Sequence, residues 1–311
     1  AAQVGTGNLV GAMTALITGG PGAIFWMWIA AFFGMATNFA EACLAQLYKD
    51  KDESGQVVGG PAYYISRGLG GGVFARFLAG FFSVAIILAL GFMGNMVQAN
   101  SISLAITSAF NVSPYVVGAL IAALVALVIV GGQRRITSIA ELVVPFMALV
   151  YILGSIVILF MFSDQNVPVF KAIFTEAFSL KSAAGGAAGT VMRYAIRYGV
   201  ARGLFSNEAG MGSTPHAHAL ANVKDPSIQG FVAMAGVFVD TMLICTATAL
   251  VIMVTGAYKD GSLQSVAITQ AAFQHAFGNT GLVFLAVSLF FFAFTTIMGW
   301  YIFGEMNVKY L

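Results

Sequence analysis

The polar residues best suited to bind a small solute lie together in the apolar middle of the chain, from Phe205 to Pro215. This stretch reads FSNEAGMGSTP and contains one carboxylate, one amide, three hydroxyls and two glycines. Inside a bilayer, backbone that is not helical leaves N–H and C=O groups unsatisfied, so it persists only where it lines a polar cavity or is covered by protein. We therefore predict that a membrane helix is interrupted here and that the interruption forms part of a binding site.

A second interruption is predicted near the start of the sequence, at Val4–Asn8, which reads VGTGN. Two apolar helices interrupted by glycine are typical of secondary transporters, whose sites lie near the middle of the membrane. We expect the two breaks to face each other and to hold an ion and a small solute.

The composition indicates that a membrane surrounds these breaks. The chain is 59% hydrophobic and 8% charged, and its mean hydropathy is +0.89. No charged residue occurs between Arg76 and Arg134, which leaves room for two spans of about 20 residues with a turn at Asn111–Pro114. A water-soluble globule is excluded, and a net charge of +2 gives no reason to expect a nucleic-acid partner. Cys43 and Cys245 lie in apolar stretches without metal-site spacing, and no nucleophile–base pair occurs, so no enzyme is expected.

The fold class predicted is an all-α polytopic membrane protein with about eight spans. The spans expected are a half-helix at 8–18, helices at 23–48, 72–108, 114–130 and 136–162, a broken helix at 189–221, and helices at 227–255 and 282–303. Shorter helices are expected at 61–69 and 169–178, with an amphipathic surface helix at 263–277. Because the chain opens inside an apolar helix and stops just after another, both ends are expected to be truncated.

The basic residues predict the orientation, since cytoplasmic loops are enriched in Lys and Arg. Most of the loop cations fall on one side, which we expect to be cytoplasmic: Lys49, Lys51, Arg67, Arg76, Arg134, Arg135, Lys224 and Lys309. The other side carries Lys171, Lys181 and Lys259.

Several motifs resemble one known family. Gly19–Gly34 reads GGPGAIFWMWIAAFFG, and the other matching motifs are GTGN at Gly5–Asn8, NMVQANS at Asn95–Ser101, GLFSNEAGMGS at Gly203–Ser213 and TTIMGW at Thr295–Trp300. Together they closely resemble the sodium:alanine (glycine) symporter family. The resemblance implies a leucine-transporter-type fold of two inverted repeats, in which helices 1 and 6 are broken. The chain would form one transporter domain, 1–311, with a first repeat at about 1–162, lacking the start of span 1, and a partial second repeat at about 186–311.

The first break has a physical rationale. Gly5 and Gly7 permit backbone conformations that other residues avoid, so carbonyl groups can turn toward a cation. The amides that begin the next half-helix suit a carboxylate, which we expect near Thr6 and Gly7, with Asn8 beside it. The resemblance implies that Na⁺, the coupling ion, is held by a carbonyl near Val4 and by the hydroxyls of Thr295 and Thr296; oxygen ligands suit this hard cation. The alternative is that GTGN is a close-packing patch between helices.

Other groups are assigned to the solute. The resemblance makes Gln98 a substrate ligand, and an amide offers a donor and an acceptor to a zwitterion. Asn95 and Asn100 are better explained by hydrogen bonds between helices. Ser206 and the backbone from Asn207 to Gly210 are candidates to contact the amine of the solute.

Trp300 follows Thr296 by one helical turn and shares its face. A ring at this position would cap a small cavity and exclude long side chains. The alternative is a tryptophan at the membrane interface.

Intramembrane carboxylates are functional candidates. Glu208 could neutralise an ammonium group or carry a proton, but the favoured interpretation is an ion pair that holds the broken helix in shape. The possible partners are Arg193, Arg197 and Arg202. Glu41 is expected to extend toward the interface and Glu141 to pair with Arg134 or Arg135, whereas Asp240 is left without a role.

The function predicted is Na⁺-coupled symport of a small neutral amino acid, alanine or glycine with serine left open, by alternating access. The protein would be a multi-pass component of the plasma or inner membrane, with the amino acid, Na⁺ and the lipid bilayer as its partners. One alternative is proton coupling through Glu208 or Asp240 in the same fold. Another is a channel or a scaffold without a transport cycle.

Overall fold

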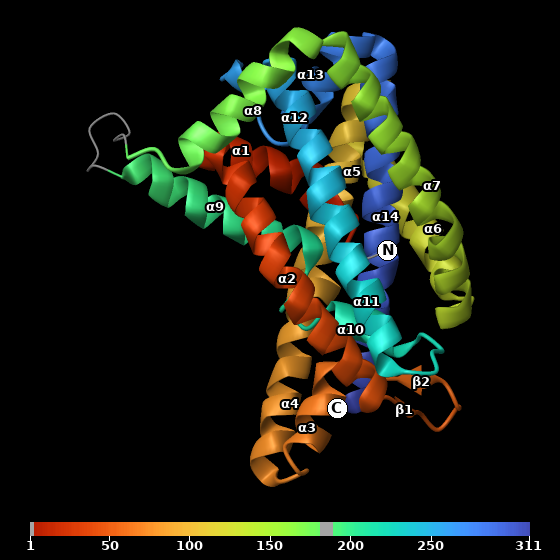
Figure 1. Cartoon of the computed structure of the whole chain (residues 1–311). Helices are drawn as coiled ribbons and strands as arrows, with labels where there is room; N and C mark the ends of the chain where they lie inside the picture. Colours follow the sequence, from red (N-terminus) through yellow and green to blue (C-terminus); the bar gives the residue numbers. More distant parts are fainter. Residues whose placement is uncertain (1–2, 181–188) are drawn as a thin grey trace.

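The computed structural model describes residues 3–180 and 189–311, and most of them are helical (Figure 1). The helices of the first half are η1 (Gly7–Gly11), α1 (Ala12–Gly19), α2 (Gly22–Leu47), α3 (Pro61–Gly68), α4 (Val73–Ile86), η2 (Ile87–Gly94), α5 (Asn95–Phe110), α6 (Pro114–Ile129) and α7 (Gly132–Met161). Those of the second half are α8 (Ser163–Ala177), α9 (Thr190–Asn207), α10 (Thr214–Ala219), α11 (Pro226–Val237), η3 (Phe238–Cys245), α12 (Thr246–Val254), η4 (Ala257–Lys259), α13 (Val266–Phe277) and α14 (Asn279–Tyr310). Lys181 and the predicted start of the second repeat at 186 lie outside the described residues.

The helices confirm that the protein is a polytopic membrane protein. Among the described residues, five helices are long and apolar enough to cross a bilayer: Gly22–Leu47, Val73–Phe110, Gly132–Met161, Pro226–Val254 and Asn279–Tyr310. Gly7–Gly19 and Pro114–Ile129 are shorter apolar helices. The total of eight spans and the inverted repeat stay predictions.

Local sequence explains where several helices begin and end. Pro114 and Pro226 occupy first-turn positions, where a missing N–H costs nothing. Asp225 caps α11, because its Oδ1 accepts from the Ser227 N–H at 2.8 Å. Asn111, in the left-handed conformation with φ 53°, ends α5. The turn predicted between the third and fourth spans therefore lies where expected.

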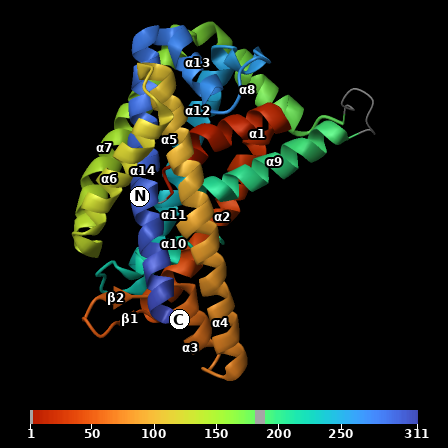
Figure 2. The same cartoon turned by 180° about the vertical axis from the view of Figure 1, so that it is seen from behind.

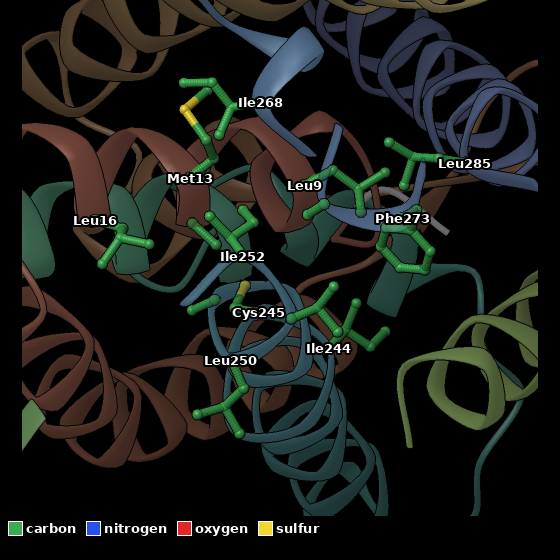
Figure 3. Close-up of a cluster of buried hydrophobic side chains, with 14 of the residues drawn as sticks. Leu9, Met13, Leu16, Ile244, Cys245, Leu250, Ile252, Ile268, Phe273 and Leu285 are labelled. Carbon is green, nitrogen blue, oxygen red and sulfur yellow. The ribbon is translucent and has the colours of Figure 1, made fainter. Parts of the chain in front are cut away.

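Helices far apart in the sequence pack together around the two breaks. Helices α1 and α9 lie side by side in both views, and α2 packs against α9 and α11 (Figures 1 and 2). Helix α14 runs through the centre and contacts α5, α7 and α13. The largest buried cluster joins η1, α1, η3, α12 and α13, and Figure 3 shows Leu9, Ile244 and Phe273 converging within it.

The helix α13 corrects one expectation, because it is not a surface helix. Its Thr269 Oγ1 donates to the Leu9 carbonyl at 3.4 Å, and its Gln270 Nε2 donates to the Ala105 carbonyl at 3.0 Å. Phe273 is fully buried. The helix therefore packs onto the first and third spans instead of lying on the membrane surface.

The charged loop after α2 contains a short antiparallel hairpin, β1 (Asp50–Lys51) and β2 (Val57–Val58). Asp50 forms an ion pair with Arg67, and Asp52 forms one with Lys309 of α14 at 2.9 Å. Hydrogen bonds from Ser54 and Lys309 hold the pKa of Asp52 well below its usual range. The hairpin is thus attached to the end of α14, away from α8 and α13 (Figure 1).

Within the described ranges, three helical segments have the wider turns of a π-helix: η1 before α1, η2 between α4 and α5, and η3 between α11 and α12. Such segments are rare and often occur at functional sites. Here each lies in, or directly beside, a helix that carries predicted or observed polar groups of the two breaks.

Candidate functional site

The predicted first break corresponds to the non-helical segment Gln3–Gly5, and the helix begins at Thr6. The Gly5 N–H donates to Asn8 Oδ1 at 2.8 Å, and the Asn8 N–H donates to the Gly5 carbonyl at 3.3 Å. This reciprocal pair satisfies two backbone groups that the break would otherwise leave unbonded. Asn8 therefore acts as a local cap for the interrupted helix.

Gly5 and Gly7 do not adopt left-handed backbone, which corrects the reason we expected for their presence. They permit close approach instead. A Cβ at Gly5 would lie 2.4 Å from Thr296 Oγ1, and one at Gly7 would lie 2.8 Å from the Ser206 Cα. Neither position has space for a side chain, so the first break lies directly against α14, and the start of η1 lies directly against the last turn of α9.

The second break lies between the end of α9 at Asn207 and the start of α10 at Thr214. Glu208, Gly210 and Gly212 have left-handed backbone, with φ of 57°, 80° and 73°. Ser206 and Asn207 were predicted inside the break but form the last helical turn before it. Gln3 Nε2 donates to the Asn207 carbonyl at 2.8 Å, so a residue of the first break satisfies the helix end of the second.

Glu41 of α2 holds the second break from outside. Its carboxylate accepts from the Gly210 N–H at 2.9 Å and from the Gly212 N–H at 3.2 Å. The expectation that Glu41 extends toward the interface was wrong. Backbone amides in the unwound segment need acceptors, and this carboxylate supplies them.

Asp240 of η3 joins the two breaks, although sequence analysis gave it no role. Its Oδ1 accepts from Asn8 Nδ2 at 2.6 Å and from Ser206 Oγ at 3.2 Å, while its Oδ2 accepts from Thr241 Oγ1 at 2.7 Å. The side chain is fully buried. A carboxylate inside an apolar span could have marked Asp240 as a functional residue from the sequence. Its partners could not be predicted, because Asn8 and Ser206 lie 232 and 34 residues away in the chain.

Glu208 does not form the ion pair that we favoured. Its Oε2 accepts from Ser213 Oγ at 2.6 Å, and its Oε1 accepts from Trp300 Nε1 at 2.7 Å. Among the described residues, no ion pair joins Glu208 to Arg193, Arg197 or Arg202. Arg193 and Arg197 are exposed on α9, so they point away from the break.

The pairing predicted for Glu141 is also wrong. Within the described part of the chain, Glu141 forms no ion pair with Arg134 or Arg135. The Arg135 guanidinium instead donates to the Leu127 carbonyl at 2.9 Å. Helix α7 begins at Gly132, so these arginines lie within its first turn rather than in a loop.

Gln98 of α5 contacts the first break. Its Oε1 accepts from the Thr6 N–H at 3.2 Å, and its Nε2 lies 3.4 Å from the position of a Cβ on Gly5. Asn95 does not bond to another helix, because its Nδ2 donates to the Gly91 carbonyl at 3.1 Å, and Asn100 is exposed. Of the three amides in this motif, only Gln98 reaches the site.

The adjacent threonines Thr295 and Thr296 of α14 differ in their contacts. Thr296 Oγ1 donates to the Val4 carbonyl at 3.1 Å and lies 3.0 Å from the Phe292 carbonyl. Thr295 Oγ1 lies 2.9 Å from the Phe291 carbonyl of its own helix. Thr296 therefore touches the first break, whereas Thr295 is buried beside it.

Trp300 is 2% exposed, so the alternative of an interfacial tryptophan is wrong. Its ring packs against Gly94, where an added Cβ would lie 2.4 Å from Cζ3. Beside it, a cavity of about 730 Å³ opens between the hairpin, α7, α10 and α14, and Gly299 and Phe303 line its wall. The cavity therefore reaches the residue next to Trp300 from the hairpin end.

The apolar spans and the buried polar cluster where two interrupted helices meet define a polytopic membrane protein with a polar centre. The model of the sodium:alanine symporter family matches residues 1–311, and the chain belongs to this family. This confirms the predicted family. A family named for symport points to a transporter rather than to an enzyme.

Curated relatives match the chain along its whole length. An uncharacterized transporter of Haemophilus influenzae is 46% identical over 100% of this chain and 64% of its own length. The putative sodium/proton-dependent alanine carrier protein YrbD of Bacillus subtilis is 45% identical over 99% of the chain and 65% of its own length. The sodium/alanine symporter AgcS of Methanococcus maripaludis is 42% identical over 100% and 68%. The chain thus spans about two thirds of the length of these relatives.

Proposed function

We propose that this protein carries a small neutral amino acid, alanine or glycine, across the inner membrane together with Na⁺. The observation that carries the proposal is the contact between the two helix ends that adjoin the breaks: Gly7 lies against Ser206, and Asp240 holds Asn8 and Ser206 together. Only an interrupted helix exposes backbone groups to a ligand at membrane depth. The names of the relatives, an alanine carrier and a sodium/alanine symporter, support the same substrates.

The substrate carboxylate would bind at the amides of Thr6 and Gly7. The Thr6 N–H donates to Gln98 Oε1, so an oxygen acceptor fits at this position, and Gln98 would turn its Nε2 toward an incoming carboxylate. The amine would approach Ser206, Asn207 and the backbone as far as Gly210. Trp300 would close the site beside the substrate side chain.

Na⁺ would bind where the first break meets α14. The Val4 carbonyl and the Thr296 hydroxyl are 3.1 Å apart, and Thr295 lies next along the helix. These are uncharged oxygen ligands, which suit a hard monovalent cation. Thr6 Oγ1 is buried and has no hydrogen-bond partner among the described residues, so a further oxygen is available near this break.

Transport would proceed by alternating access in a leucine-transporter-type fold. The repeats would be about 1–162 and about 186–311, within one domain. Release would lead through the cavity at the hairpin end, which lies beside Trp300 and which the distribution of Lys and Arg assigns to the cytoplasm.

Coupling requires that Na⁺ and the amino acid stabilise the same state, so each must raise the affinity of the other by the same factor. The test is binding of alanine to the purified protein in Na⁺ and after replacement of Na⁺ by choline. We expect affinity to fall sharply in choline. Undiminished binding would eliminate Na⁺ coupling, and competition with glycine, serine and leucine would rank the substrates.

Proton coupling is the second candidate, because two carboxylates are buried at the breaks. Neither Glu208 nor Asp240 forms an ion pair with a basic residue in the described ranges, and a buried carboxylate without a cation tends to take up a proton. One relative is named sodium/proton-dependent. The test is whether alanine drives acidification of Na⁺-free liposomes that contain the protein. Acidification that Asp240→Asn or Glu208→Gln abolishes would favour proton coupling. If the parent protein showed no acidification, proton coupling would be eliminated.

A further inference from the structure

Helix α14 touches both breaks with two side chains that lie one turn apart. Thr296 Oγ1 donates to the Val4 carbonyl of the first break, and Trp300 Nε1 donates to Glu208 of the second break. Residues four apart share a helix face. The ring of Trp300 is thus held at the second break by a single polar contact.

The ring is enclosed in a buried apolar cluster with Leu90 and Phe303, and one side of it lies against Gly94. Gly94 lies against Cζ3 and Cε3 of Trp300, at 2.4 and 2.9 Å from the position that a Cβ would take. Gly94 precedes Gln98 by four residues in the same helical span. The ring therefore stands beside the groups that we assign to the substrate, and its angle determines the space there.

Glu208 is suited to fix that angle. It is 1% exposed, its backbone has φ 57°, and each carboxylate oxygen accepts one hydrogen bond, from Ser213 or from Trp300. A non-glycine residue with left-handed backbone is uncommon and must be held by its surroundings. A buried indole N–H in turn needs an acceptor. For Trp300 this acceptor is the carboxylate of Glu208.

We propose that Glu208 is a positioning residue: it fixes the orientation of the Trp300 ring, and through this ring it limits the size of the amino acid side chain that the site accepts. The inference rests on the proposed function for its substrates. Without the acceptor, the indole N–H seeks another partner and the ring leaves its place against Gly94. The space beside Gln98 then widens, so larger neutral amino acids gain affinity relative to alanine.

The first readout needs no ligand. With Trp26 and Trp28 both replaced by Phe, Trp300 is the only tryptophan among these 311 residues. Its indole N–H resonance, in ¹⁵N-labelled protein, reports the hydrogen bond to Glu208. We expect Glu208→Leu to move this resonance upfield, because the strong acceptor is lost, and Ser213→Ala to leave the hydrogen bond in place.

The second readout is the ratio of alanine affinity to methionine affinity in saturating Na⁺. Glu208→Gln keeps an acceptor for the indole and a donor toward Ser213, so the ratio should stay near that of the parent. Glu208→Leu should lower the ratio by about tenfold, the scale expected when a pocket gains or loses one or two methylene groups. Glu53→Gln, in the exposed hairpin loop, is the matched control and should change nothing.

Each contrary result has a definite meaning. An unchanged ratio and an unmoved resonance in Glu208→Leu would overturn the proposal. Loss of all amino acid binding in folded Glu208→Gln would also overturn it, because the carboxylate would then contact the substrate itself. If the parent bound no neutral amino acid, the proposed function would fail, whereas the resonance would still decide whether Glu208 holds Trp300. Should Glu208→Leu not fold, Glu208→Ala, which also removes the acceptor, combined with Trp300→Phe gives a double-mutant cycle for the same contact, and additive effects would refute it.

Discussion

The first break, at Gln3–Gly5, and the second, at Glu208–Ser213, interrupt their helices by different means. The first contains no left-handed residue; Gly5 brings its backbone against Thr296, and Gly7, in the helix that follows, lies against Ser206. The second depends on left-handed backbone at three positions and on the Glu41 carboxylate, which accepts hydrogen bonds from its amides. Glycine therefore serves close approach beside the first break, whereas at the second it serves backbone conformation and, at Gly212, close packing against Phe82 as well. Substitutions should separate these two roles.

The largest effect is expected from Asp240, because it joins both breaks. Asp240→Ala leaves the donors of Asn8, Ser206 and Thr241 without their acceptor, and each buried unsatisfied donor costs about 1–3 kcal/mol. We expect roughly 3 kcal/mol or more of lost stability and no detectable alanine binding, measured by thermal unfolding in detergent and by equilibrium binding. Asp164→Asn, exposed on α8, is the control. A parent-like melting temperature for Asp240→Ala would show that the breaks are held together by other contacts.

Gly7→Ala tests close approach at the first break. The new methyl group would lie 2.8 Å from the Ser206 Cα, which is backbone and cannot turn aside. Overpacking of this kind costs about 1–3 kcal/mol, and the distance between the breaks should increase, so alanine affinity should fall. Gly11→Ala is a matched control four residues along, since nothing lies within 4 Å of its Cβ position. Equal melting temperatures for the two variants would refute the close-approach role.

Glu41→Gln tests the support of the second break alone. A glutamine offers one acceptor oxygen, so one of the Gly210 and Gly212 amides loses its partner, at a cost of about 1–2 kcal/mol. We expect faster hydrogen exchange in peptides that cover 208–213, with no change in peptides that cover 3–11. Acceleration in both segments would mean that the breaks are not supported independently.

Gly210→Ala should have the smallest effect of the four. Its Cβ would meet only Thr37 Cγ2 at an ordinary 3.4 Å, so the cost comes from left-handed backbone, about 1–2 kcal/mol. Gly210→Asn should recover part of this loss, because asparagine tolerates that conformation better. If asparagine were no better than alanine in thermal unfolding, space rather than φ would decide at Gly210.

Much of the architecture was accessible from the sequence. Long apolar stretches located the five described helices that could cross a bilayer, and a polar glycine-containing stretch located the second break, because the cost of placing such residues in lipid leaves few explanations for them. The helix that begins at Pro114 and the turn at Asn111 follow from local chemistry alone. Gln98 lies at the first break, and its role as a substrate ligand stays a prediction.

The misses share a cause. Glu41, Asp240 and Glu208 find their partners across helices, and spacing along one helix does not show which neighbour faces it. The expected arginine partners of Glu208 illustrate this, since charge favoured an ion pair whereas packing supplied Ser213 and Trp300. Helix α13 was predicted to lie on the membrane surface, but it packs on protein. A protein interior and a lipid surface both favour apolar residues on one helix face, so the sequence does not distinguish them.

The wide turns in η1, η2 and η3 change which residues share a helix face. A π-helical turn holds more residues than the 3.6 of an α-helix, so each such segment offsets the angular position of everything that follows it. A helical wheel drawn continuously from Val73 to Phe110, or from Pro226 to Val254, therefore assigns Gln98 and the residues after Asp240 to the wrong side. Comparisons of these helices with other chains need separate wheels before and after each wide segment.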